Sequence, residues 1–347
     1  MAYAIDGPLG RFCHQYLQLE MKLDYPDADL LRQSSVQEAL YEHLFADGAV
    51  PFPPPHRYRL RVLKDLLSRI EKSINDWEEQ GVSDNLMEAF AEMLDVPVPS
   101  ETEAVQKMDY VTYYLSLLKS EENPEGDSNS SAVKNCITVF ESRGLLATSG
   151  TTGMRTWEAG LHLGQYLCTA PELVKGKRVL ELGTGTGYVS VLCAKYLGAQ
   201  KVVATDGSED VIRDLSDTIF LNGLQESANF SIMELVWGRA LLGTEDAEWN
   251  GGEEIDVVLG SDITYDSRAQ PALIATLGEL FDLFPKVRVI ISTAERNVAT
   301  LNNLLGICKA QGLLVDFIDF PTPTAEEQQG PFYDTSVPIH IVEIRKQ

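Results

Sequence analysis

One run near the middle of the chain constrains the fold more than any other feature of the sequence. An apolar segment, RVLEL at 178–182, leads into the glycine-rich turn GTGTG at 183–187, and the helical segment VSVLCAKYLG follows. Glycine lets the backbone turn sharply and approach a ligand closely, and the next helix presents its N-terminus at the same point. The run therefore predicts a buried strand that ends in a ligand-binding turn.

Short apolar runs alternate with helical segments throughout the chain from about residue 133. Beside the run at 178–182 these are KVVATDG, NFSIMELVW, EIDVVLGSD, KVRVIIST, LLVDFIDF and PIHIVEIRK. Buried runs separated by amphipathic helices indicate a mostly parallel sheet that is covered on both faces. We therefore expect an α/β domain over residues 133–347.

The N-terminal part has the periodicity of helices. Ser35 and Glu38 have the spacing of a capping box at the start of a short helix. A second helix is predicted from Tyr58 to about Glu79, a third over 84–94, and 110–118 favours either a fourth helix or a strand. These segments predict a mainly helical accessory domain over residues 1–120. The polar, acidic stretch at 121–132 cannot bury enough apolar surface to become ordered and predicts a flexible linker or loop.

Acidic side chains dominate the charge. The chain has 28 Lys and Arg against 52 Asp and Glu, a formal net charge of −24, and residues 1–130 alone hold 11 basic and 24 acidic side chains. Such a field repels phosphate backbones and anionic lipid surfaces, so we expect no direct nucleic acid binding and no membrane binding. The acidity serves either solubility or attraction to a basic protein surface.

The cysteines and the N-terminus indicate an intracellular protein. The five cysteines are widely spaced and form no CxxC or Cys/His cluster, so neither a disulfide framework nor a metal site is expected. The start MAYAIDGPLGRF lacks the pattern of a secretory leader, and no apolar stretch approaches ~18 residues. We expect a cytoplasmic monomer. The five histidines form no constellation and no GxSxG is present, so hydrolase chemistry finds no support.

Two carboxylates help to identify the ligand of the glycine turn. Glu181 stands two residues before Gly183, which suits a cationic cofactor such as S-adenosylmethionine better than an anionic dinucleotide. Asp206 ends the next run, 19 residues beyond Gly187, where a carboxylate accepts hydrogen bonds from ribose hydroxyls. Both NAD and S-adenosylmethionine carry that ribose, so Asp206 does not separate them. The alternative for Asp206 is to cap the following helix.

Further candidates stand at the ends of the next two runs. Trp237 follows the third run, where an indole can cover an adenine face, although a core tryptophan is the alternative. Ser261, Asp262 and Tyr265 follow the fourth run, at the edge where open α/β sheets place their ligands. Taken together, these positions favour a methyltransferase fold.

With these residues in view, the chain resembles the class I, seven-β-strand methyltransferases, and within them the eukaryotic, fungal-like elongation factor 2 lysine methyltransferase family. The segment from Asp262 to Tyr265 looks like a DxxY signature, GTTGMRTWEA at 150–159 is similar to GTTGxxTWxA, and LNG at 221–223 also fits. The resemblance is strong over 149–266 and implies a Rossmann-like methyltransferase domain behind a helical extension. It also implies S-adenosyl-L-methionine as cofactor and translation elongation factor 2 as protein substrate.

The resemblance implies a cofactor pocket formed by Trp157, Gly183, Thr184, Gly185, Asp206, Trp237 and Ser261. Ser261 departs from the family, in which alanine is frequent at this position, and the change is conservative for a backbone contact. The catalytic residues would be Asp262 and Tyr265.

Methyl transfer to an amine is an in-line displacement on an activated sulfonium, so the enzyme mainly aligns the reacting atoms and needs no metal. The acceptor lysine has to be neutral although its ordinary pKa is about 10.4. We expect Asp262 to hold the amine and Tyr265 to orient it or to wall its channel. In the structural alternative Asp262 caps a loop and Tyr265 only packs. Other functions left open are methylation of another protein, a nicotinamide-dependent oxidoreductase and a non-catalytic cofactor-binding module.

Overall fold

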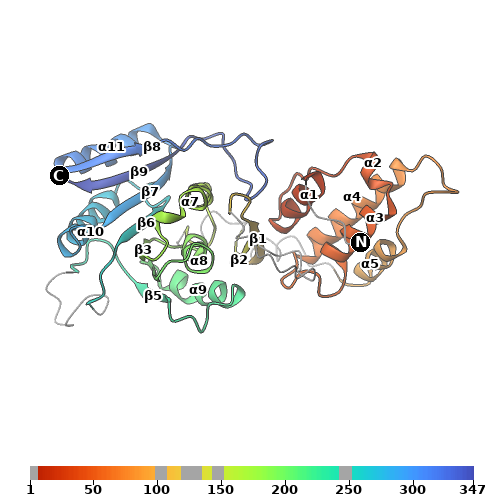
Figure 1. Cartoon of the computed structure of the whole chain (residues 1–347), viewed down its shortest axis with the longest axis horizontal. Coiled ribbons are helices and arrows are strands. Elements are labelled where there is room, and N and C mark those ends of the chain that lie inside the picture. The colour runs from red at the N-terminus through yellow and green to blue at the C-terminus, as the bar shows by residue number, and fades with distance from the viewer. Residues whose placement is uncertain (1–6, 98–107, 119–134, 143–151, 242–251) are drawn as a thin grey trace. The chain divides into compact units, whose positions relative to one another are not determined.

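The computed structural model of the protein describes residues 7–97, 108–118, 135–142, 152–241 and 252–347 (Figure 1). The chain divides into two units that are not contiguous in sequence. The first consists of Met1–Ser116, Ser120–Leu145 and Gln329–Phe332, and the second of Leu117–Lys119, Leu146–Gln328 and Tyr333–Gln347. The predicted linker at 121–132 lies outside the described residues.

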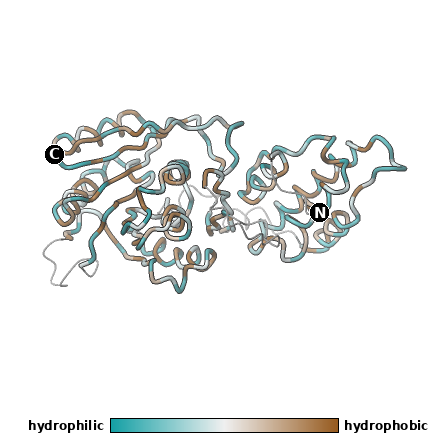
Figure 2. The backbone as a smooth tube through the Cα atoms, in the orientation of Figure 1, coloured by the Kyte–Doolittle hydropathy of each residue, from teal (hydrophilic) through white to brown (hydrophobic). Residues whose placement is uncertain are grey.

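The first unit is mainly helical. Its elements are α1 (Gly7–Leu17), α2 (Ala28–Leu31), α3 (Ser34–Leu40), a π-helical turn η1 (Tyr41–Phe45), α4 (His56–Ser73), α5 (Asp84–Leu94) and the strands β1 (Asp109–Tyr114) and β2 (Cys136–Glu141). Phe12 and Tyr16 of α1 and Leu66 of α4 are fully buried in one apolar cluster. Figure 2 shows the amphipathic character of these helices as alternating hydrophobic and hydrophilic turns.

Two of the predicted helices differ from the structure at their ends. The capping box is wrong, because the Glu38 carboxylate accepts hydrogen bonds from Ser83 Oγ at 2.6 Å and Asn85 Nδ2 at 2.7 Å. The second helix ends at Ser73 rather than near 79. Beyond it the Asp76 carboxylate accepts from the backbone N–H of Glu78 at 2.9 Å, and such local hydrogen bonds compete with a helix. The third helix is confirmed as α5, with Ser83 as its N-cap.

The segment at 110–118 is a strand as far as Tyr114. β1 pairs with β2 in an antiparallel hairpin, in which Val111 lies opposite Val139 and the hydroxyls of Thr112 and Thr138 are 2.9 Å apart. This pairing places β2 in the first unit together with β1, because a hairpin cannot be divided without losing its hydrogen bonds.

A short segment from near the C-terminus also belongs to the first unit. The buried side chain of Gln18 donates to the carbonyl of Phe332, and its Oε1 accepts from the Phe332 N–H at 2.8 Å. The backbone N–H of Ser116 donates to the carbonyl of Gly330 at 3.1 Å. Nothing in the sequence pattern predicted this return of the chain.

The second unit alternates strands and helices. Its elements are α7 (Glu158–Thr169), η2 (Pro171–Leu173), β3 (Arg178–Leu182), α8 (Tyr188–Lys195), β4 (Lys201–Asp206), α9 (Glu209–Leu221), β5 (Phe230–Glu234), β6 (Val257–Ser261), α10 (Gln270–Leu283), β7 (Arg288–Ala294), α11 (Val298–Ala310), β8 (Leu313–Ile318) and β9 (Ile339–Lys346). All seven apolar runs of the sequence are strands, so this prediction is confirmed.

The strands form one sheet in the order β5-β4-β3-β6-β7-β9-β8. The pairs from β5 to β7 are parallel, whereas β9 is antiparallel to both β7 and β8. The direction of winding reverses between β3 and β6, and open α/β sheets bind ligands beyond the carboxyl ends of the strands at such a point. The predicted α/β fold with a seven-stranded, Rossmann-like sheet is confirmed.

Helices cover both faces of this sheet (Figure 1). Leu180 and Leu182 of β3 share an apolar cluster with Leu277 of α10 and Leu304 of α11. Because side chains alternate along a strand, Glu181 lies on the other face, where α7, α8 and α9 contact the strands. A carboxylate thus stands in a buried layer, among polar side chains such as Ser190 of α8.

Among the described helices, none is both long and apolar enough to cross a membrane. Over the same ranges, His, Cys, Asp and Glu side chains nowhere gather in a group of three that could hold a metal ion.

Candidate active site

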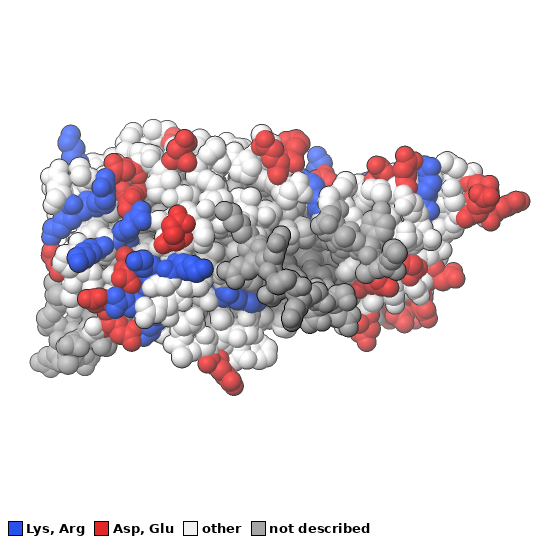
Figure 3. All heavy atoms as spheres, in the orientation of Figure 1, with Lys and Arg blue, Asp and Glu red and all other residues white. Residues whose placement is uncertain are grey.

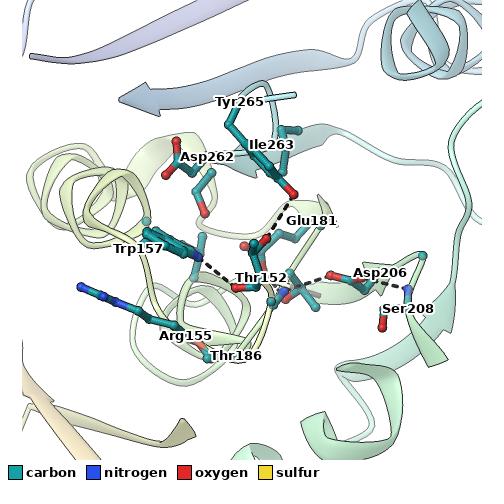
Figure 4. A pocket seen from close by; sticks show the side chains of 18 of the residues that line it. Thr152, Arg155, Trp157, Glu181, Thr186, Asp206, Ser208, Asp262, Ile263 and Tyr265 are labelled. Atoms are coloured by element: carbon teal, nitrogen blue, oxygen red, sulfur yellow. Dashed lines mark hydrogen bonds between the residues drawn. The ribbon is translucent and has the colours of Figure 1, made fainter. Parts of the chain in front are cut away.

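A cavity of about 1020 Å³ opens where β3, β4 and β6 end. The glycine turn, the loops after β4, β5 and β6, and the start of α7 supply its walls (Figure 4). It brings together every site residue that the sequence predicted, namely Trp157, Gly183, Thr184, Gly185, Asp206, Trp237, Ser261, Asp262 and Tyr265. Most of them end a parallel strand or follow one closely. Because the carboxyl ends of parallel strands meet at one edge of the sheet, residues at these positions can be selected from the sequence.

The glycines of the turn are required by both conformation and space. Gly183 and Gly185 have φ values of +64° and +52°, in the left-handed region that other residues rarely adopt. A Cβ atom at Gly183 would lie 2.7 Å from Cγ2 of Ile263, and one at Gly185 would lie 3.1 Å from the carbonyl oxygen of Gly153. A side chain at either position would push the turn against its neighbours.

Glu181 lies beneath the turn and is 1% exposed. Its Oε2 accepts hydrogen bonds from Thr184 Oγ1 at 2.7 Å and from Ser190 Oγ at 2.5 Å. Its Oε1 is buried and has no hydrogen-bond partner within the described ranges. Burial raises the pKa of this carboxyl to about 7, against the effect of its two hydroxyl donors. The site therefore holds a buried carboxylate with one oxygen left for a donor from the cavity.

Asp206 ends β4 and accepts hydrogen bonds from backbone groups. Its Oδ2 accepts from the N–H of Gly185 at 3.2 Å and its Oδ1 from the N–H of Ser208 at 3.0 Å. Burial raises the pKa of this carboxyl, and the backbone donors oppose the rise. Each carboxylate oxygen can accept a further hydrogen bond, so Asp206 remains able to bind a ligand hydroxyl.

Two tryptophans line the cavity from different elements. Trp157 precedes α7 and donates from Nε1 to the carbonyl of Thr152 at 3.0 Å. Trp237 follows β5, packs against the apolar cluster beneath the sheet and would lie 3.4 Å from a Cβ on Gly183. Trp237 is thus partly a core residue and partly a wall of the cavity, and its contact with an adenine stays a prediction.

Asp262 lies directly after β6 and is 6% exposed. Its backbone has φ +55°, its N–H donates to the carbonyl of Ser292 at 2.8 Å, and its side chain accepts from the N–H of Ala294 at 3.3 Å. It also forms an ion pair with Arg296 Nη1 at 2.7 Å. Burial raises the pKa of the Asp262 carboxyl, and the Arg296 guanidinium opposes the rise.

The sequence pattern did not point to Arg296, the charged partner of Asp262. Arg296 also donates from Nη2 to Oε2 of Glu158 at 2.7 Å, and its guanidinium lies 5.1 Å from the ring centre of Trp157. The guanidinium of Arg155 lies 4.9 Å from the same ring. Arg296 follows the end of β7, the neighbour of β6, so the strand-end argument that selected Asp262 would also have selected Arg296.

Tyr265 is 56% exposed and reaches across the cavity (Figure 4). Its hydroxyl lies 3.1 Å from Oγ1 of Thr152. Ser261 is the last residue of β6, and its Oγ would lie 3.2 Å from a Cβ on Gly160. The strand end thus approaches the helix that begins after Trp157 closely enough to favour glycine there.

The other two motifs of the resemblance, GTTGMRTWEA and LNG, lie in different parts of the second unit. Gly150 and Thr151 of the GTTG segment lie outside the described residues, whereas Thr156 from the same motif approaches Thr186 of the glycine turn, with 2.6 Å between their Oγ1 atoms. The LNG segment ends α9, where Asn222 Nδ2 donates to the carbonyl of Thr218 at 2.8 Å. Thr156 and Thr186 line the cavity, whereas Leu221, Asn222 and Gly223 do not.

Comparison with known proteins identifies the class of this site. A family model described as lysine methyltransferase matches residues 146–306. The protein-lysine N-methyltransferase EFM3 of Chaetomium thermophilum is 57% identical to this chain over 337 residues, which cover 97% of both chains. EFM3 of Saccharomyces cerevisiae is 30% identical over 61% of this chain and 66% of its own. The human protein-lysine N-methyltransferase EEF2KMT is 27% identical over 76% of this chain and 71% of its own.

These similarities overturn two alternatives that the residues alone had left open. The interpretations as a nicotinamide-dependent oxidoreductase and as a non-catalytic module are wrong, since the relative that matches 97% of the chain is a protein-lysine N-methyltransferase and the family model is that of a lysine methyltransferase. The glycine turn, the acidic strand ends and these relatives agree. This chain belongs to the family of protein-lysine N-methyltransferases.

Proposed function

We propose that this enzyme uses S-adenosyl-L-methionine to methylate a lysine of translation elongation factor 2. The observation that carries the chemistry is that one cavity holds the glycine turn and Asp206 together with Asp262 and Tyr265, with Asp206 and Asp262 on opposite sides of it in Figure 4. The substrate assignment is supported by the likeness of the DxxY and GTTGxxTWxA segments to the elongation factor 2 lysine methyltransferases. Similarity to the relative named EEF2KMT points in the same direction.

The residues present fit this cofactor. Gly183 and Gly185 line the cavity without side chains, so a ligand can lie directly against the backbone of the turn. The unpartnered Oε1 of Glu181 suits the cationic amino group of the methionine part. The cavity volume of about 1020 Å³ is at the upper end of the range for small-molecule sites, which leaves space for an acceptor side chain as well.

We assign the ribose to Asp206 and the adenine to the neighbourhood of Trp237. The Asp206 carboxylate is held by the N–H groups of Gly185 and Ser208, which fix its orientation and leave acceptor positions for two hydroxyls. The Trp237 indole offers an aromatic surface beside the turn.

When bound, the cofactor supplies a methyl group on a positively charged sulfur that is already activated for displacement. The chain itself has to bring the acceptor amine into line and keep water out. Asp262 would accept a hydrogen bond from the amine, and Tyr265, with its hydroxyl beside Thr152, would form the wall that directs it. These two residues are the proposed catalytic pair.

We further propose that the first unit attracts a basic surface of the protein substrate. Acidic side chains cluster over its helices on the face drawn in Figure 3. Attraction of this kind raises the association rate and weakens as salt screens it. Reversing the charge of the exposed Glu88 and Glu92 of α5 should slow association and reduce its salt dependence. Reversal of the exposed Asp217 and Glu226 of the second unit is the matched control, and equal effects of both double changes would contradict the proposal.

The experiment that tests the substrate is methylation of a proteome extract by the purified protein, with a labelled methyl donor and mass spectrometry of the product. Labelling of a lysine of elongation factor 2 is expected. Labelling of a lysine in another protein alone would replace this substrate with the runner-up, a lysine methyltransferase that acts elsewhere.

A further inference from the structure

The guanidinium of Arg296 bridges two carboxylates on the side of the cavity where Asp262 lies. It donates from Nη1 to Asp262 and from Nη2 to Glu158, both at 2.7 Å, and lies against the ring of Trp157. These contacts hold a side chain that is 39% exposed. A planar guanidinium can span two carboxylates in this way, whereas a lysine ammonium acts as a point charge.

The charges of this cluster balance one another. Asp262 and Glu158 contribute two negative charges, and Arg296 and Arg155 two positive ones, with Arg155 Nη2 3.4 Å from Oε1 of Glu158. The titratable side chains that line the same cavity also include Tyr265, Tyr188, Glu181 and Asp206. Next along the chain is Glu295, which His340 of β9 contacts from Nε2 at 2.6 Å. A lysine that reaches Asp262 therefore meets a carboxylate that is already neutralised by a permanent cation.

We propose that Arg296 is a positioning residue that keeps the acceptor lysine in its neutral, nucleophilic form. This inference rests on the proposed assignment of the acceptor to Asp262 and Tyr265. A fixed positive charge beside a base disfavours its protonated form and lowers its pKa. A free carboxylate at the same place would do the opposite and hold the lysine as an unreactive ammonium.

The proton and the electron pairs balance without a further group. The lysine ammonium releases its proton to solvent before transfer. The lone pair that this frees on Nζ forms the new N–C bond, and the electron pair of the broken S–C bond remains on sulfur. Arg296 keeps its protons throughout, because a guanidinium is not deprotonated in proteins. Asp262 stays ionised and accepts a hydrogen bond from the amine.

The test compares Arg296→Met with Arg296→Lys. Single-turnover methylation is measured against pH with saturating cofactor and protein substrate, and substrate affinity is titrated without cofactor. In Arg296→Met the pH midpoint of turnover should rise by about one to two units, which lowers turnover at pH 7 by roughly 10- to 100-fold. The protein substrate should bind at least as tightly as before. Arg296→Lys retains the charge and should restore the midpoint.

Arg268→Met is the matched control, because Arg268 pairs with Asp266 at the exposed surface and is absent from the cavity lining. It should leave both the midpoint and the affinity unchanged. Glu158→Gln removes a negative charge from the bridge and should lower the midpoint, which gives a second test if Arg296→Met does not fold.

An unshifted midpoint in a folded Arg296→Met overturns the inference, because a purely structural role lowers turnover equally at every pH. A midpoint in Arg296→Lys that matches Arg296→Met also overturns it, as does faster turnover at pH 7 without the guanidinium. Failure of the proposed function looks different: the unmodified enzyme would then label another protein, and the same pH series would be measured on that acceptor.

Discussion

Asp206 and Asp262 are two carboxylates that each follow a buried parallel strand and reach the same cavity, yet their surroundings differ. Asp206 accepts hydrogen bonds from the backbone N–H groups of Gly185 and Ser208, which are neutral donors. Asp262 is paired with the guanidinium of Arg296. Burial raises the pKa of both carboxyls, so burial alone does not distinguish them.

The difference indicates that the two carboxylates suit different parts of the ligands. A carboxylate held by neutral donors keeps its full charge and suits the hydroxyls of a ligand that stays chemically unchanged. A carboxylate balanced by a permanent cation suits an amine that has to lose its charge before it reacts. The comparison predicts that changes at the two carboxylates affect different steps.

The largest effect is expected at Asp262. Asp262→Asn keeps the shape of the side chain and tolerates the left-handed backbone better than alanine. It replaces a charged acceptor for the amine with a weaker neutral one and removes the carboxylate that pairs with Arg296. Turnover should fall by ~10²-fold or more while cofactor affinity stays nearly unchanged. Single-turnover transfer with saturating cofactor, paired with a binding titration, measures both. Full activity in folded Asp262→Asn would make the residue a structural cap and remove the distinction between the two carboxylates.

The next effect is expected at Asp206 and concerns binding. Asp206→Ala should weaken cofactor affinity by about 1–3 kcal/mol through lost charge-assisted hydrogen bonds, with little change in turnover at saturation. Calorimetry measures the affinity. Asp210→Ala, at an exposed ion pair with Arg213 on α9, is the control and should leave affinity unchanged. Unchanged affinity in Asp206→Ala would contradict the assignment of the ribose.

A smaller, pH-dependent effect is expected from Glu181. Its pKa of about 7 means that the carboxyl is partly protonated before binding. A cationic amino group favours the ionised form, so the proton has to leave as the cofactor binds and affinity should fall as the pH falls. The decrease should be about fivefold between pH 7 and pH 6, where the α-amino group stays charged. The cofactor affinity of Glu181→Gln should not change between pH 7 and pH 6. If the affinity of this variant falls as steeply as that of the unmodified enzyme, the proton belongs to another group.

The smallest effect is expected at Tyr265. Tyr265→Phe keeps the aromatic wall and removes only the hydroxyl beside Thr152, a loss of about 0.5–1.5 kcal/mol in transition-state stabilisation. Single-turnover kinetics would show this as a reduction of severalfold, with unchanged cofactor affinity. If cofactor affinity fell instead, Tyr265 would contact the cofactor, and the proposed separation between Asp206 and Asp262 would not extend to this residue.

The parts of the molecule that could be predicted from sequence are those where one local pattern has one structural meaning. The apolar runs are all strands, and parallel strands bring their ends to one edge, which explains why Asp206, Trp237 and Asp262 share a cavity. Contacts between distant segments have no such signature. The pairing of Asp262 with Arg296 depends on β6 and β7 being neighbours, and the hairpin of β1 and β2 depends on segments separated by an unpatterned stretch.

The return of residues 329–332 to the first unit has a consequence for how the chain is made. A ribosome completes most domains from the N-terminus onward, and each can fold before the next is finished. Here the carbonyl and N–H that complete the hydrogen bonds of Gln18 belong to Phe332, which is synthesised after every strand of the sheet except β9. The N-terminal unit therefore reaches its final set of contacts late in translation, when nearly all of the catalytic unit already exists.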